Sequence, residues 1–177
     1  MSDTDMSFVQ TGGKDDWQTP TTVTAPIVDA HGGIDLDPCA GSETDIGEVN
    51  FRPPKNGLAR RWEGVVFVNP PFSAKADWLA KAVEESKRSQ VDVVYVLTPD
   101  ATDVAAWWHE FIAAEASVTW FATSRVNFID PAEGEAVSGV PFNTAISVFG
   151  EAPDELLRHW DETGDLVFRP QNAGWSV

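Results

Sequence analysis

The segment VFVNPPF, residues 66–72, places an amide, two prolines and an aromatic ring directly after an apolar run. Proline has no N–H for a sheet ladder and pushes the preceding residue into extended geometry, so the pair predicts a stiff corner at the end of a strand. Such a corner could serve a planar exocyclic amine. The side-chain oxygen of Asn69 and the main-chain carbonyl of Pro70 could accept the two amine hydrogens. Pro71 would fix the corner, and Phe72 could stack on the ring of the substrate.

The lone pair of an aromatic amine is delocalised into its ring, which makes the nitrogen a weak nucleophile. Two acceptors against the N–H hydrogens would draw the nitrogen toward tetrahedral geometry and release the lone pair for attack. Alignment of the reacting atoms would then do most of the catalytic work, and the proton could leave during or after transfer. An ordinary tight turn with Phe72 in the core is the alternative, because Asn-Pro is a common turn signal.

The elements around this corner alternate between strand and helix patterns. Apolar runs predict strands over 34–36, 64–69, 91–97 and 117–122, and periodic or capped stretches predict helices over 19–33, 75–89, 103–114 and 153–163. The segments 125–130 and 143–150 could pair as an antiparallel ribbon, and 165–169 could form an edge strand. The pattern predicts an α/β fold with a mostly parallel sheet and a late antiparallel pair. Since such sheets bind ligands at the carboxyl ends of their strands, DLDPCAGS (35–42) and VNPPF (68–72) should face one rim.

Several local features have a simpler structural explanation. Pro26 is awkward inside the first helix and could break or kink it. Asp103 is explained as a helix cap. Packing in the core is the expected role for at least one of Trp107 and Trp108, and His109 is expected on the helix surface.

Composition indicates one globular domain. The chain has 177 residues, of which 42% are hydrophobic, and we expect residues 1–14 to be a flexible acidic tail before a single domain at 15–177. No apolar run approaches the roughly 20 residues of a membrane helix, and the N-terminus has no signal-peptide pattern. One cysteine excludes an internal disulfide and fits a reducing cytoplasm. Three dispersed histidines and one cysteine argue against a zinc site, so no metal is expected.

The net charge is −16, with 28 acidic against 12 basic residues. Taken alone, this acidity argues against nucleic acid as a partner, because phosphate binding normally uses a basic surface. It could serve solubility, or it could be an adaptation to high salt. At about 1 M salt the Debye length is only about 3 Å, so long-range repulsion from a polyanion largely vanishes.

The corner also resembles the catalytic motif of amino-methyltransferases that use S-adenosylmethionine. Moreover, the chain is similar to the phage-type, Dam-like DNA N6-adenine methyltransferases over roughly residues 15–150. The resemblance is carried, in order, by DDWQTP (15–20), IDLDPCA (34–40), NGLARRW (56–62), VFVNPPF (66–72), LTPDATDVAAWWHEF (97–111), RVNF (125–128) and VPFNTAISVF (140–149). It implies a Rossmann-like class I methyltransferase sheet.

The resemblance implies a cofactor pocket for S-adenosylmethionine. Its wall would include Asp37, Pro38, Cys39 and Ala40, and it would be closed near the methionine end by Trp17, Thr19 and Pro20. The usual glycine-rich loop is reduced here to DPCAGSET, with the single glycine Gly41. The residue that would hold the ribose is left open among Glu48, Asn50 and Asn56.

The implied substrate is DNA, double-stranded, with the target base flipped out of the helix. Candidate contacts to the DNA backbone are Lys55, Arg60, Arg61 and Lys75, and a solvated, salt-bridged face is their alternative role. Arg125 could meet a phosphate. The family places Phe142 and Asn143 beside the pocket of the target base, although Phe142 could equally be a core residue. The loop 131–141 would help to read a short recognition site.

The sequence therefore predicts a virus- or prophage-encoded DNA adenine-N6 methyltransferase in the host cytoplasm. It would release S-adenosylhomocysteine. The alternatives keep the chemistry on RNA adenine, cytosine N4 or a protein glutamine, or replace the enzyme with a catalytically silent nucleic-acid-binding module on the same fold. No G-x-S-x-G elbow or P-loop points to hydrolase or NTPase chemistry.

Overall fold

The computed structural model describes residues 18–41, 45–129 and 143–169. The expectations for the acidic tail, Trp17, the loop 131–141 and Phe142 lie outside these residues, as does the placement of the Phe72 side chain.

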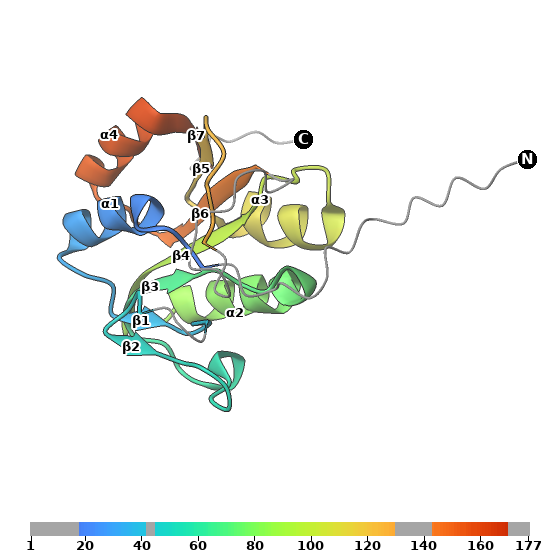
Figure 1. The fold of residues 1–177 in the computed structure, drawn as a ribbon. Helices are drawn as coiled ribbons and strands as arrows, with labels where there is room; N and C mark the ends of the chain where they lie inside the picture. The colour runs from blue at the N-terminus through green and yellow to red at the C-terminus, as the bar shows by residue number, and fades with distance from the viewer. Residues whose placement is uncertain (1–17, 42–44, 130–142, 170–177) are drawn as a thin grey trace, which may run out of the picture.

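The described residues form a seven-stranded sheet in the order β2-β1-β3-β4-β6-β5-β7 (Figure 1). β2, β1, β3 and β4 are parallel, whereas β6 runs antiparallel to β4 and β5, and β7 runs antiparallel to β5. This confirms the predicted α/β class with late antiparallel strands. The strands are β1 (Leu36–Asp37), β2 (Val49–Asn50), β3 (Gly64–Val68), β4 (Val91–Pro99), β5 (Val118–Ala122), β6 (Thr144–Gly150) and the edge strand β7 (Gly164–Phe168).

Helices cover both faces of the sheet. α1 (Thr21–His31) and α4 (Asp154–Thr163) lie on one face. On the other face lie α2 (Lys75–Ser86) and a helix made of the π-helical segment η3 (Ala105–Ile112) and α3 (Ala113–Glu115). The short 3-10 turns η1 (Gly57–Ala59) and η2 (Phe72–Ala74) precede β3 and α2. In the described part of the chain, no helix has the length and apolar character needed to cross a bilayer.

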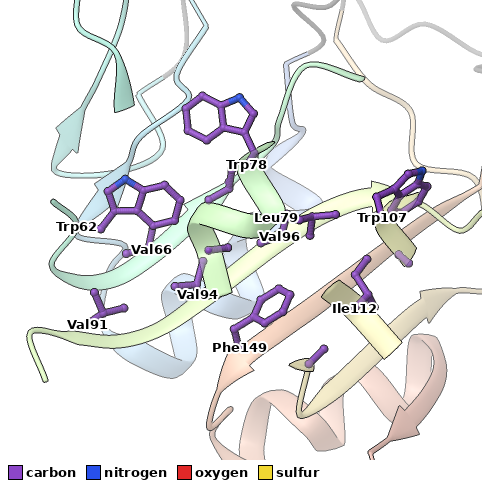
Figure 2. Close-up of a cluster of buried hydrophobic side chains, with 14 of the residues drawn as sticks. Trp62, Val66, Trp78, Leu79, Val91, Val94, Val96, Trp107, Ile112 and Phe149 are labelled. Atoms are coloured by element: carbon purple, nitrogen blue, oxygen red, sulfur yellow. The ribbon is translucent and has the colours of Figure 1, made fainter. Parts of the chain in front are cut away.

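The strands β3 and β4 are buried on both faces, as their continuous apolar runs predict. Val65 and Phe67 face the helices α1 and α4, whereas Val66 and Val68 face α2. Figure 2 shows the second of these clusters, in which Trp62, Trp78 and Phe149 pack around the aliphatic residues of β3 and β4. The central strands are thus fixed from both sides, which makes their carboxyl ends a rigid support for the residues that follow.

The predicted ribbon between 125–130 and 143–150 is wrong. Both edges of β6 are occupied by β4 and β5, so no edge is left for the segment before it. In the described part of that segment, a single antiparallel bridge joins Ile129 to Gln18 instead. The late antiparallel pairing that the sequence indicated is therefore made by β4, β5, β6 and β7.

Smaller differences concern element ends. The first strand is Leu36–Asp37, not 34–36. Pro26 lies inside α1 without ending the helix, which stops at Gly32, a residue with a φ of 79°. The cap predicted at Asp103 is wrong, since the N-cap of η3 is Val104 and no side chain caps it. Trp107 and Trp108 are both buried and His109 is exposed, as expected.

Candidate active site

The two predicted motifs meet at one edge of the sheet. β1 and β3 are neighbouring parallel strands, with Leu36 paired to Val66. The segments that begin at Asp37 and Asn69 therefore leave the sheet side by side, which confirms that they face one rim.

A cavity of about 320 Å³ lies at this rim. Its size falls within the range of small-molecule and cofactor sites, which is roughly 300–1,000 Å³. The walls come from five parts of the chain. They are Gln18 and Thr19 before α1; Asp37, Pro38, Cys39, Ala40 and Gly41 after β1; Ile46, Phe51, Pro53, Pro54, Lys55, Asn56 and Gly57 around β2; Asn69 and Pro71 after β3; and Trp78 of α2.

Asn69 is held by a neighbour that is distant in sequence. Its Nδ2 donates to Thr19 Oγ1 at 3.1 Å. Thr19 is buried and follows Gln18, whose N–H and carbonyl both bond to Ile129 at 3.1 Å. On the other side of Asn69, Pro70 is buried, and the Pro71 carbonyl accepts from Ala74 N at 3.0 Å. The corner predicted from the two prolines is thus fixed at both ends.

Asp37 places a buried carboxyl group in the cavity wall. It is 3% exposed, and its Oδ1 accepts from Cys39 N at 2.9 Å. Burial raises the pKa of Asp37 to about 7, although the Cys39 amide and the charge of Arg52 both oppose the increase. Arg52 also donates from Nε to the Gly41 carbonyl at 2.9 Å, so it holds the loop that carries Asp37, Pro38, Cys39 and Ala40.

The wall at 51–57 depends on a close backbone approach. A Cβ built on Gly57 would lie 2.0 Å from the Pro38 carbonyl oxygen, so only glycine fits there. The Gly57 carbonyl accepts from the indole nitrogen of the buried Trp62 at 3.0 Å. This contact ties the cavity wall to the core cluster of Figure 2.

The three ribose candidates have different locations. Asn56 lines the cavity, and its Oδ1 also accepts from Leu58 N at 3.0 Å. Asn50 instead bonds to both backbone groups of Gly47. Glu48 lines a separate hollow at the amino ends of β1, β3 and β4.

The predicted DNA contacts are not all near the cavity. Lys55 lines it, and the Arg60 guanidinium lies 5.5 Å from the ring centroid of Phe51, another wall residue. The Lys75 ammonium lies 5.3 Å from the centroid of Trp107. The structure does not bring Arg61 to this rim, because it pairs with Glu84 at 3.0 Å and Glu85 at 3.2 Å beside the start of β3.

Four further predicted residues lie outside the cavity wall. Pro70 is buried between the wall residues Asn69 and Pro71. Pro20 is the N-cap of α1, and together with Arg125 it lines a neighbouring hollow of about 410 Å³. Asn143 is exposed, and its carbonyl accepts from Asp100 N at 3.3 Å.

Sequence reasoning missed Gln18, Phe51 and Trp78 as wall residues. Trp78 was assigned to the apolar side of its helix, and it does stack on Trp62 with ring centroids 6.3 Å apart. The available signal was its place in the first turn of the helix that follows the proline corner, because that turn must lie at the same rim. No comparable signal marks Phe51, which stands in the segment 40–62 that the sequence left without elements.

The sheet of this protein, parallel over β2, β1, β3 and β4 and antiparallel afterwards, is consistent with a class I methyltransferase fold. The family model described as DNA N-6-adenine-methyltransferase (Dam) matches residues 6–159. The chain therefore belongs to the Dam family of DNA N-6-adenine-methyltransferases, as the motifs indicated.

Two phage proteins, both named DNA N-6-adenine-methyltransferase, are similar to the chain. The protein of Escherichia phage T1 is 28% identical over an alignment of 155 residues, which covers 78% of this chain and 63% of that protein. The protein of Haemophilus phage HP1 (strain HP1c1) is 27% identical over 125 residues, 69% of this chain and 70% of that protein. The chain thus spans less than two thirds of the length of its phage T1 relative.

Proposed function

We propose that this protein transfers a methyl group from S-adenosylmethionine to the N6 amine of adenine in DNA. The observation that carries the proposal is that Asn69 and Pro71 share one cavity with the Asp37–Gly41 loop. The amide that would bind the substrate amine therefore lies within reach of the wall that could hold a methyl donor. Family membership and the names of the two phage relatives support DNA adenine as the substrate.

The cavity wall suits S-adenosylmethionine, which would supply the methyl group. Phe51, Trp78 and the prolines give flat apolar surface for a base or ribose. Asp37 provides a buried carboxyl whose ionised form would favour a cation nearby. Pro38, Cys39 and Ala40 would complete the side wall, and Asn56 is the best placed of the ribose candidates.

The catalytic role falls to Asn69 and its neighbours. Asn69 Oδ1 and the Pro70 carbonyl would accept the two N–H hydrogens of the amine, while Pro71 keeps the corner rigid. Phe72 would stack on an adenine flipped out of the duplex. No metal takes part in this scheme, and the described residues contain no group of three or more potential metal ligands.

DNA would approach over the rim that carries the cavity. Lys55 lines the cavity and Arg60 lies over its wall residue Phe51, so both could contact DNA there, and Lys75 and Arg125 could contact phosphates farther along the rim. We propose that the protein works in the cytoplasm of the phage host and that its acidity reflects a salt-rich interior.

The test is to incubate the protein with unmethylated duplex DNA and labelled S-adenosylmethionine at low and at molar salt, then digest the DNA and identify the labelled nucleoside. We expect N6-methyladenine, and Asn69→Ala should lower the rate by at least about 100-fold while the protein stays folded. Label on cytosine, or no label at either salt concentration, would overturn the proposed substrate. An undiminished rate in Asn69→Ala would refute the mechanism.

A further inference from the structure

The Asn69 amide has two unlike ends, and only one of them suits an amine substrate. The oxygen can accept a hydrogen from the amine, whereas the nitrogen would place its own hydrogens against those of the amine. The reaction therefore needs the amide group to be held where its oxygen can reach the amine, and a hydrogen-bonded neighbour would hold it there.

Thr19 is such a neighbour. Its Oγ1 lies 3.1 Å from Asn69 Nδ2, across 50 positions of sequence. The hydroxyl accepts one Nδ2 hydrogen and so restrains the whole amide group. Because a hydroxyl can also donate, the contact fixes the position of the amide and does not choose between its two ends. Both residues line the cavity, so the contact lies at the proposed site of transfer.

The backbone holds Thr19 in place from both sides. Gln18 forms two main-chain hydrogen bonds with Ile129, and Pro20 caps α1 while its carbonyl accepts from Val23 N at 3.0 Å. Thr19 is only 8% exposed, and its branched side chain has few rotamers. The hydroxyl is thus fixed before any substrate arrives.

We infer that Thr19 is a positioning residue for methyl transfer, which holds the Asn69 amide in place at the cavity. This inference rests on the proposed function and goes beyond the cofactor-lining role that the family resemblance implies for Thr19. The two roles differ kinetically. A residue that only lines the cofactor pocket changes the affinity for the methyl donor, whereas a residue that holds the catalytic amide in place changes kcat.

The experiment compares Thr19→Val, which keeps the shape of the side chain and removes the hydroxyl, with Thr19→Ser, which keeps the hydroxyl. Thr22→Val, at an exposed position of α1, is the matched control. We expect Thr19→Val to lower kcat on duplex DNA about 10- to 100-fold. Its Kd for S-adenosylmethionine, measured by calorimetry, should stay within about 3-fold, and Thr19→Ser and Thr22→Val should keep kcat within about the same factor.

A second readout does not depend on turnover. The side-chain NH2 resonances of Asn69, assigned by their loss in Asn69→Ala, should shift and exchange faster with solvent in Thr19→Val but not in Thr19→Ser. An unchanged resonance, an unchanged kcat, or a loss confined to donor affinity would overturn the inference while leaving the proposed function intact. A wild-type protein that methylates no substrate would overturn both.

Discussion

The buried carboxyl of Asp37 should make the stability of the protein depend on pH in a predictable direction. Its pKa rises from 3.8 to about 7 on folding, mainly because burial penalises the charged form. The folded state therefore binds the Asp37 proton more tightly than the unfolded state. The contribution of Asp37 protonation to the free energy of unfolding is therefore complete below pH 4, decreases as the pH rises and is lost above pH 7.

The size of the effect follows from the width of that window. Each pH unit in which only the folded state holds the proton changes the free energy of unfolding by about 1.4 kcal/mol. Between pH 5 and pH 8, loss of the Asp37 proton should therefore lower the free energy of unfolding of the wild-type protein by about 2.5 kcal/mol. Asp37→Asn keeps an oxygen for the Cys39 N–H but has no proton to lose. The difference in unfolding free energy between variant and wild type should thus move by that amount in favour of the variant.

Urea denaturation of the cofactor-free protein at half-unit steps from pH 5 to pH 8 measures this difference. Using the difference removes the contributions of other titrating groups that the substitution leaves unchanged. Asp161→Asn, at an exposed position of α4, controls for the loss of one negative charge. A difference that stays flat across the range, or one that Asp161→Asn reproduces, would refute the argument that burial dominates the pKa of Asp37.

Two further substitutions test the supports of the site. Glu85 is fully buried and accepts hydrogen bonds from Lys81, Arg61, Arg88 and Trp62 N. Glu85→Ala should destabilise the protein by about 3–5 kcal/mol in urea denaturation, because it leaves the buried Trp62 N–H and the partly buried Lys81 and Arg88 side chains without their acceptor. These hydrogen bonds lower its pKa to about 2, so the penalty should shrink as the pH falls from 4.5 toward 2, and a penalty independent of pH would contradict this. Gly57→Ala should lower the free energy of unfolding by about 1–3 kcal/mol, because the added Cβ meets the Pro38 carbonyl. The variant should also bind S-adenosylmethionine more weakly in calorimetry. An affinity equal to that of the wild type would show that the cofactor does not use this wall.

The part of the fold that could be predicted is the part in which local pattern and burial agree. β3 and β4 are continuous apolar runs because both of their faces are covered, and that pattern has few alternatives. Neighbouring parallel strands end at the same edge of a sheet, so the topology predicted that Asp37 and Asn69 would lie at one rim. The proline corner added the direction in which Asn69 leaves the sheet.

What the sequence did not reveal depends on contacts between distant segments. The hydrogen bond from Asn69 to Thr19 spans 50 positions and has no periodic signal. The partner of residues 125–130 was assigned wrongly because β6 reads as a strand in any pairing, and its burial between β4 and β5 is decided by the whole sheet. Arg61 was grouped with Arg60 by adjacency, yet the two neighbours extend toward different partners.

The distribution of charge resolves a conflict that composition alone could not. A net charge of −16 opposes a DNA substrate, but part of this charge is gathered at one place in the structure. Asp35, Glu48, Glu63 and Asp92 gather around a hollow of about 750 Å³ at the amino ends of β1, β3 and β4. Lys55 and Arg60 stand at the carboxyl ends, beside the cavity.

At about 0.1 M salt the Debye length is about 10 Å, so a phosphate at the cavity rim is influenced mainly by charges at that rim. The sheet separates the two sites, because the hollow lined by Asp35, Glu48, Glu63 and Asp92 lies at the amino ends of the strands and the cavity lies at their carboxyl ends, where the acidic wall residue Asp37 is buried. Under the proposed function, DNA would be repelled at the end of the sheet that carries those four carboxylates and would approach at the end that carries Lys55 and Arg60. The amide of Asn69 lies at this second end.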